Sequence, residues 1–156
     1  MADIVLNKEL HFTYPEGFHE MDEAERKKLN FIQEGPGIVI SDPDRHIIVS
    51  IGWKKSGIGS LLLSPDDVAR NMEKTVSRSM DSFSYQVGGF DRRPMDGVTA
   101  IGFDYVYEAK GIQMTGSSYV AEKGRTFYYF NFYGRTARKA ENEEIWGDML
   151  ASVRWE

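Results

Sequence analysis

Histidines are the side chains in this sequence best suited to metal ligation or general base chemistry. There are three, His11, His19 and His46, and no two have the i, i+4 or His-x-His spacing that places two imidazoles on one metal. His11 and His19 flank a turn that also holds Glu16 and Glu20, but surface or capping histidines are commoner in such places. Cysteine is absent, so disulfides and thiolate chemistry are excluded. The sequence therefore predicts no metal and no cofactor.

Nucleophile and phosphate-binding motifs are incomplete. Gly116-Ser117-Ser118 lacks the second glycine of the Gly-x-Ser-x-Gly turn that exposes a serine nucleophile. Gly57-Ile58-Gly59 lacks the third glycine of a dinucleotide fingerprint and the Gly-Lys-Ser/Thr of a phosphate loop. Acidic pairs such as Asp66-Asp67 fall at helix starts, so paired-carboxylate catalysis would need acids that the fold brings together. We expect a protein without catalytic activity.

The segment from Lys123 to Phe130 partly matches the aromatic motif of RNA-recognition sheets. Arg125 replaces the aromatic third residue of that motif, and Thr126 replaces its small fourth residue. The net charge of −5 also opposes binding to nucleic acid or to an anionic membrane surface. We therefore expect neither a nucleic acid nor a membrane as a partner.

The candidate contact residues lie on one predicted strand and the loop after it. Polar groups there, beside a layer of tyrosines, would suit a small ligand. Basic and aliphatic side chains in the loop over residues 54–63 would suit a partner, unless the leucines pack beneath the next helix. The candidates are Arg45, His46, Trp53, Lys54, Lys55, Leu61 and Leu62.

Helix signals mark the elements that must position these groups. Ser64-Pro65-Asp66-Asp67 combines a serine cap, a proline in the first turn and acids at the positive end of the helix dipole. Apolar residues then recur every four positions as far as Met80, which predicts one buried face. Asp22 and Glu25 form a capping-box pattern that predicts a short helix over residues 23–30. Residues 137–153 predict the closing helix.

Strands are predicted for residues 9–14, 38–41, 46–53 and 83–90, and three more fall between Val98 and Tyr133. The last of these is aromatic on both faces, so both faces must be covered. The tyrosines are predicted to form one layer, which more often packs beneath a helix than opens into a ligand cleft. They are Tyr105, Tyr107, Tyr119, Tyr129 and Tyr133.

Length and composition predict one domain over residues 1–156, because 156 residues with 41% hydrophobic content suit a single core. The first residues lack the basic and apolar regions of a signal peptide. No stretch approaches the ~20 apolar residues of a membrane span. We expect a cytoplasmic protein.

Two motifs and the order of elements resemble the Mog/PsbP-like superfamily. Tyr14-Pro15-Glu16-Gly17-Phe18 ends an opening strand, and Asp42 to Trp53 matches the Asp-x-Asp-Arg-His hairpin expected of bacterial members of unassigned function. The resemblance covers nearly the whole chain. It implies an α+β fold, an antiparallel β-sheet of about six or seven strands with helices on both faces, in an α/β/α sandwich.

The resemblance implies accessory or protein-binding work. One branch of the superfamily binds the small GTPase Ran and promotes nucleotide release, and another is an extrinsic subunit of photosystem II. No residue of this chain matches the functional positions of either branch. We therefore expect a non-catalytic protein-interaction or accessory module whose partner is another protein, with a homo-oligomer left open. The alternative is a small-ligand-binding domain with a pocket near the 45–53 strand.

Overall fold

The computed structural model describes residues 1–29, 35–55 and 63–156. A seven-stranded antiparallel sheet in the order β3-β4-β5-β9-β8-β7-β6 forms its centre. The strands are β3 (His19–Glu20), β4 (Gly37–Asp42), β5 (Ile47–Lys55), β6 (Gln86–Met95), β7 (Val98–Ala109), β8 (Ile112–Lys123) and β9 (Thr126–Arg135). The prediction of six or seven antiparallel strands is confirmed.

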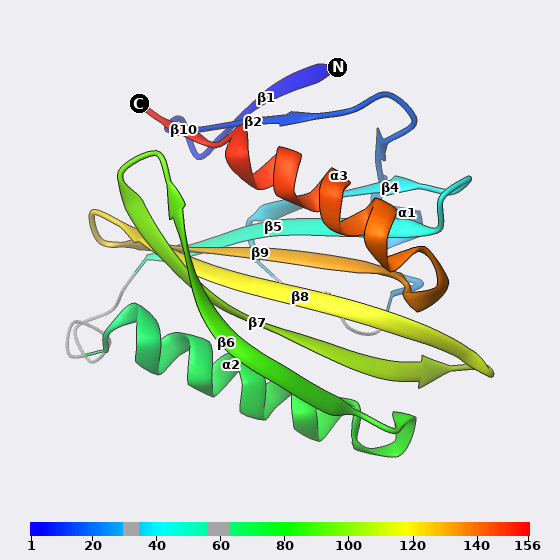
Figure 1. The fold of residues 1–156 in the computed structure, drawn as a ribbon. Helices are drawn as coiled ribbons and strands as arrows, with labels where there is room; N and C mark the ends of the chain where they lie inside the picture. Colours follow the sequence, from blue (N-terminus) through cyan, green and yellow to red (C-terminus); the bar gives the residue numbers. More distant parts are fainter. Residues whose placement is uncertain (30–34, 56–62) are drawn as a thin grey trace.

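Helices and a second sheet cover the two faces of this sheet. The described helices are α1 (Glu23–Arg26), α2 (Pro65–Ser79) and α3 (Lys139–Ala151), and the second sheet joins β1 (Ala2–Leu6), β2 (Leu10–Tyr14) and β10 (Arg154–Trp155). Figure 1 shows α3 and the small sheet above the large sheet and α2 below it. The prediction of helices on both faces is confirmed.

Helix α2 begins where the sequence predicts, because Ser64 and Asp67 form a capping box. The Ser64 Oγ accepts the Asp67 N–H at 3.2 Å, and the Asp67 carboxylate accepts the Ser64 N–H at 3.1 Å. That second bond lowers the pKa of Asp67. The apolar side of the helix, including Met72, packs on β7 and β8.

Two apolar clusters flank the large sheet. The cluster under α3 and the small sheet includes Phe12, Phe130 and Trp146. The cluster under α2 includes Phe103 and Met72. Because side chains alternate between the faces of a strand, the aromatic residues of β9 contribute to both clusters.

The tyrosine layer is buried under α2, as predicted, with one correction. Tyr105, Tyr107 and Tyr133 are buried in the cluster beneath α2, and Tyr129 packs against it. Tyr119 lies instead on the opposite face, in the cluster beneath α3. It pairs with Gly102 of β7, one residue out of phase with the other tyrosines.

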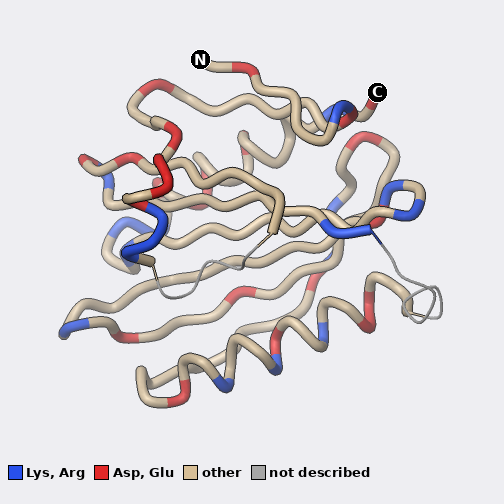
Figure 2. Tube along the Cα trace, turned by 180° about the vertical axis from the view of Figure 1, so that it is seen from behind, with Lys and Arg blue, Asp and Glu red and all other residues tan. Residues whose placement is uncertain are grey.

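Several elements differ from the predictions. The short helix extends only from Glu23 to Arg26. The strand predicted from Phe83 begins at Gln86, because a 3-10 turn comes first and Ser84 has a left-handed backbone. Strands β1, β3 and β10 were not predicted. Figure 2 shows that charged residues lie mainly in turns, on helices and near strand ends, and the buried centre of the sheet carries few.

Every helix in the described ranges is too short or too polar to span a membrane.

Candidate functional site

The predicted contact residue Arg45 links three separate segments of the chain. Its Nη1 donates to the buried carboxylate of Asp42 at 2.7 Å and to the Glu16 carbonyl oxygen at 3.3 Å, and its Nε lies 3.7 Å from the Glu141 carboxylate on α3. Gly17, at φ +100°, leaves room for this group, since a Cβ there would come within 2.7 Å of the Asp42 carboxylate. The two motifs behind the family resemblance therefore brace each other.

The structure does not bring Arg45, His46 and Trp53 to one hollow. His46 is exposed in the turn before β5, with φ at 58°. Trp53 lies near the far end of β5 with its ring 6.4 Å from that of Tyr128. Trp53 follows His46 by seven positions, which along a strand is about 23 Å at roughly 3.3 Å per residue. Of the remaining candidates, Lys54 and Lys55 are exposed on β5, and Leu61 and Leu62 lie outside the described residues.

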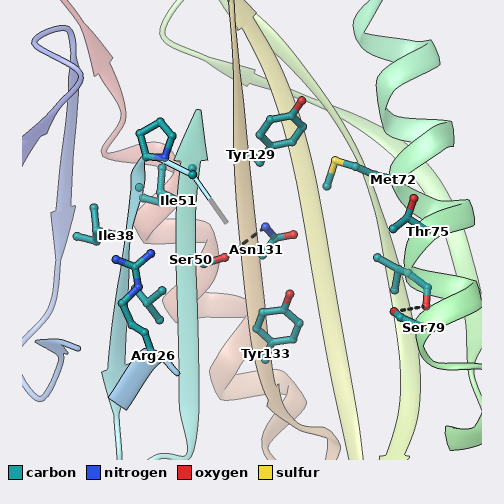
Figure 3. Close-up of a pocket in the computed structure, with 16 residues that line it drawn as sticks. Arg26, Ile38, Ser50, Ile51, Met72, Thr75, Ser79, Tyr129, Asn131 and Tyr133 are labelled. Atoms are coloured by element: carbon teal, nitrogen blue, oxygen red, sulfur yellow. Dashed lines mark hydrogen bonds between the residues drawn. The ribbon is translucent and has the colours of Figure 1, made fainter. Parts of the chain in front are cut away.

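A groove does border the middle of β5, on the α2 side of the sheet. This α2-side groove measures about 260 Å³, and an adjoining hollow of about 480 Å³ reaches Trp53 and Lys54. Ser50 and Asn131 lie on the floor of the groove, with the Asn131 amide donating to Ser50 at 3.3 Å, and the hydroxyl of the buried Ser118 donates to Asn131 at 2.6 Å. Figure 3 shows Ser50 and Asn131 on this floor. Because these polar groups are hydrogen-bonded to one another, they do not need a ligand to complete their hydrogen bonds.

A second hollow, lined by both charged and apolar side chains, lies on the opposite face, between α3 and strands β6 to β8. This α3-side hollow has a volume of about 470 Å³, which is within the usual range for small-ligand sites. Its charged lining residues are Asp91, Arg93, Asp104, Lys139 and Glu143. Its apolar lining includes Val87, Val106, Phe132 and Trp146.

One wall of the hollow is ordered around Tyr119. Gly102 on β7 lets the Tyr119 ring and the Ser118 carbonyl oxygen approach that strand closely, because a Cβ at Gly102 would fall 2.5 Å from the ring and would collide with that oxygen. The Tyr119 hydroxyl donates to the Asp91 carboxylate, 2.9 Å from each oxygen. The Arg93 guanidinium stacks 5.7 Å from the ring centre. Burial raises the pKa of Tyr119 to about 12, so the hydroxyl keeps its proton.

The base of the hollow joins α3 to Asp104. The Trp146 indole N–H donates to the Ser117 Oγ at 3.1 Å, in a buried position. Ser117 pairs with Asp104 across β7 and β8, and its hydroxyl is hydrogen-bonded to the Asp104 carboxylate. A helix, two strands and a buried indole thus fix the position of this carboxylate.

Asp104 is the carboxylate whose charge the hollow disfavours. Although Asp104 is exposed, partial withdrawal of its carboxylate from water raises its pKa, and the nearby charges of Asp91 and Glu143 raise it further, while the Ser117 hydroxyl and the Lys139 charge act in the opposite direction. Glu143 has Lys139 at 3.8 Å, whereas Asp104 forms no ion pair among the described residues. The pKa of a functional acid is often perturbed in this way.

Asn142 on α3 supplies a second acceptor without a donor. Its side chain is only 5% exposed, and its amide nitrogen donates to the Arg135 carbonyl oxygen at 3.4 Å. Its Oδ1 has no hydrogen-bond partner in the described part of the chain. Buried polar atoms usually have a hydrogen-bond partner, so this oxygen is an available acceptor in the lining of the hollow.

None of these hollow-lining residues is among the sequence-predicted candidates. The available signal was Asp104, a charged residue in the middle of an otherwise apolar strand, but its neighbours Ser117 and Asn142 come from elsewhere in the sequence. No group of three or more His, Asp or Glu side chains in the described ranges is arranged to hold a metal ion.

No protein family model and no curated protein sequence matches this chain. Solved structures do match. Cyanobacterial PsbP from Synechocystis sp. PCC 6803 aligns with a TM-score of 0.68 at 16% identity, covering 94% of this chain and 86% of its own. LpqN, involved in cell envelope biogenesis of Mycobacterium tuberculosis, aligns with a TM-score of 0.64 at 13% identity, covering 94% and 82%. A Pseudomonas aeruginosa protein of unknown function aligns with a TM-score of 0.61 at 12% identity, covering 79% and 85%.

These similarities establish the fold. The chain has a PsbP-like fold, which confirms the fold class that the resemblance in the sequence implied.

Proposed function

We propose that this protein is a non-catalytic binding module and that the α3-side hollow is its ligand site. The observation that carries the proposal is Asp104, a carboxylate with no ion-pair partner among the described residues, set in a hollow of about 470 Å³. The residue keeps contact with solvent, yet partial withdrawal of its carboxylate from water and the neighbouring acids raise its pKa. Retaining it here costs stability, and sites that bind ligands commonly carry such a cost.

The surroundings of Asp104 suit binding more than they suit structure. The hydrogen bonds of Ser117 and Tyr119 fix the polar groups before any ligand arrives, which lowers the entropy lost on binding. Trp146 and Phe132, with ring centres 5.2 Å apart, supply apolar surface beside them. The combination of a few fixed polar groups and apolar walls is typical of small-molecule sites.

The protein-interaction role expected from the sequence stays a prediction, as do a homo-oligomer and the cytoplasmic location. The protein-interaction role is supported by exposed apolar side chains near β6, where Phe83, Val87 and Phe90 are 46%, 43% and 47% exposed. The strand also carries a register shift between Val87 and Phe90 and a proline at position 94. Bulges and prolines protect a sheet edge from pairing with another strand, so the ligand-binding proposal has the stronger support.

The test is to fill the hollow. Val106 lines it and is 37% exposed, so Val106→Trp adds bulk there without removing core packing. Val5→Trp is the matched control, because Val5 is a 54% exposed strand residue outside the hollow. We expect fragments detected by ligand-observed NMR to bind the wild type and Val5→Trp, and to bind Val106→Trp at least ~10-fold more weakly, the equivalent of about 1.4 kcal/mol. Equal binding to all three proteins, or no binding to the wild type, would contradict the proposal.

A further inference from the structure

We propose that the α3-side hollow recognises a small organic cation, with an ammonium or guanidinium group at the Asp104 carboxylate and an apolar body against the wall of α3. This inference rests on the proposed function, since it assigns a chemical class to the ligand of the same hollow.

The hydrogen-bond inventory favours a ligand that donates. The Asp104 carboxylate is exposed to solvent at the hollow and can accept about four hydrogen bonds, of which the Ser117 hydroxyl supplies one, so its remaining lone pairs are accessible to a ligand. The Asn142 Oδ1, on the facing helix, accepts none. An ammonium group brings three N–H donors and a guanidinium five, and neither brings an acceptor.

The other charged groups of the hollow are already engaged. Asp91 receives the Tyr119 hydroxyl at 2.9 Å on both oxygens, and Glu143 has Lys139 at 3.8 Å. The Arg93 guanidinium lies over the Tyr119 ring at 5.7 Å. The lining holds three carboxylates and two cationic side chains, and neither Asp91 nor Asp104 forms an ion pair among the described residues. Of the two, Asp91 already receives the Tyr119 hydroxyl on both oxygens, which leaves Asp104 more available to a cation.

This charge arrangement excludes an anion as the preferred occupant. A carboxylate or phosphate entering the hollow would meet Asp91, Asp104 and Glu143, and would have to draw Arg93 or Lys139 from present contacts. A cation at Asp104 instead relieves the repulsion among the three acids. Charge-assisted hydrogen bonds of this kind are about twice as strong as neutral ones.

The apolar lining sets the second half of the ligand. Val106 offers exposed surface at the mouth, and the Trp146 ring packs on Phe132 behind it. An aromatic or alkyl group of the ligand therefore has surface to cover within reach of the charged end. Benzylammonium carries both parts in one small molecule, and benzyl alcohol is its neutral counterpart of nearly equal size.

The inference is tested by titrating both compounds into isotope-labelled protein and following amide shifts by NMR. We expect the wild type to bind benzylammonium about 10-fold more tightly than benzyl alcohol. Asp104→Asn should reduce that ratio to near one while leaving the affinity for benzyl alcohol unchanged. Asp148→Asn is the matched control, because Asp148 is an exposed acid on α3 outside the hollow, and it should keep the wild-type ratio.

A second variant tests the effect of charge on binding by removing a positive side chain from the hollow. Lys139→Gln removes the hollow's own ammonium group, so we expect it to tighten benzylammonium binding two- to threefold. Equal binding of the two compounds to the wild type, or a preference retained by Asp104→Asn, would overturn the assignment of a cation and leave the binding role standing. If neither compound binds and the fragment screen is also empty, both proposals fail.

Discussion

Two aspartates show how surroundings decide what a carboxylate does in this protein. Asp42 is only 2% exposed, but Arg45 and two backbone N–H groups bind its oxygens, so it is a structural residue. Asp104 is more exposed but has no cation paired with it among the described residues. Sequence reasoning placed Arg45 among contact residues because an exposed arginine and a bracing arginine look alike in sequence.

Removing Arg45 should destabilise the protein. Arg45→Ala leaves the buried Asp42 carboxylate without its cation, and we expect a loss of about 1–3 kcal/mol in the free energy of unfolding. Urea denaturation at pH 7 measures it. Arg70→Ala, at an exposed arginine on α2, should change stability by less than about 0.5 kcal/mol. Equal effects of the two substitutions would show that the brace contributes nothing.

Neutralising Asp104 should stabilise the protein at neutral pH. Its raised pKa means that the folded state favours the protonated form, so the folding penalty is absent at low pH and appears as pH rises through that pKa. Asp104→Asn should therefore raise the melting temperature at pH 7, by an amount equivalent to less than about 1 kcal/mol because solvent screens the charge. The gain should disappear near pH 3. A gain that is independent of pH would point to packing and not charge.

At the scale of elements, the sheet depends on glycines that let aromatic rings cross a strand. A Cβ at Gly102 would collide with the Tyr119 ring, and one at Gly116 would collide with the Tyr105 ring. Both glycines lie in the middle of strands, where glycine otherwise weakens pairing. The ring over Gly116 explains that glycine, and at Gly102 the ring acts together with the Ser118 carbonyl oxygen of the neighbouring strand.

Gly102→Ala should displace Tyr119 and cost about 1–3 kcal/mol, as other overpacked sites do. Gly89→Ala is the control, because a Cβ at Gly89 meets nothing within 4 Å. Thermal unfolding of the two variants measures the difference. If Gly102→Ala melted at the same temperature as Gly89→Ala, the close approach of the Tyr119 ring and the Ser118 carbonyl oxygen to Gly102 would contribute nothing to stability.

Elements with local signals were predictable from the sequence. The Ser64 cap predicted the start of α2, and the alternation of apolar residues after His46 predicted β5. The start of β6 was not predictable, because the left-handed Ser84 has no strong sequence signal. The α3-side hollow was not predictable either, since Ser117 and Asn142 come together only when α3 packs across the sheet.

At the scale of the whole molecule, tyrosines line both clusters and keep their protons. Burial raises the pKa of Tyr107, Tyr119 and Tyr128 to about 12. Because these values lie above the ordinary pKa near 10, the tyrosines stabilise the folded state at neutral pH, and this stability is lost as pH rises from 10 through 12.

Alkaline titration should therefore show coupled ionisation and unfolding. We expect absorbance at about 295 nm, which reports tyrosinate, to rise mainly between roughly pH 11 and 12.5, together with loss of near-ultraviolet circular dichroism. Titration in denaturant is the reference and should centre near pH 10. A native-state titration that also centres near 10, without unfolding, would contradict the burial of these hydroxyls.

The proposal that an organic cation binds at Asp104 is tested most directly by a crystal structure of the protein with benzylammonium. We predict density in the α3-side hollow, with the ammonium nitrogen about 2.7–3.0 Å from the Asp104 carboxylate and the ring against the Val106 and Trp146 wall. Density in the α2-side groove beside Ser50 and Asn131, or an ammonium turned away from Asp104, would contradict it.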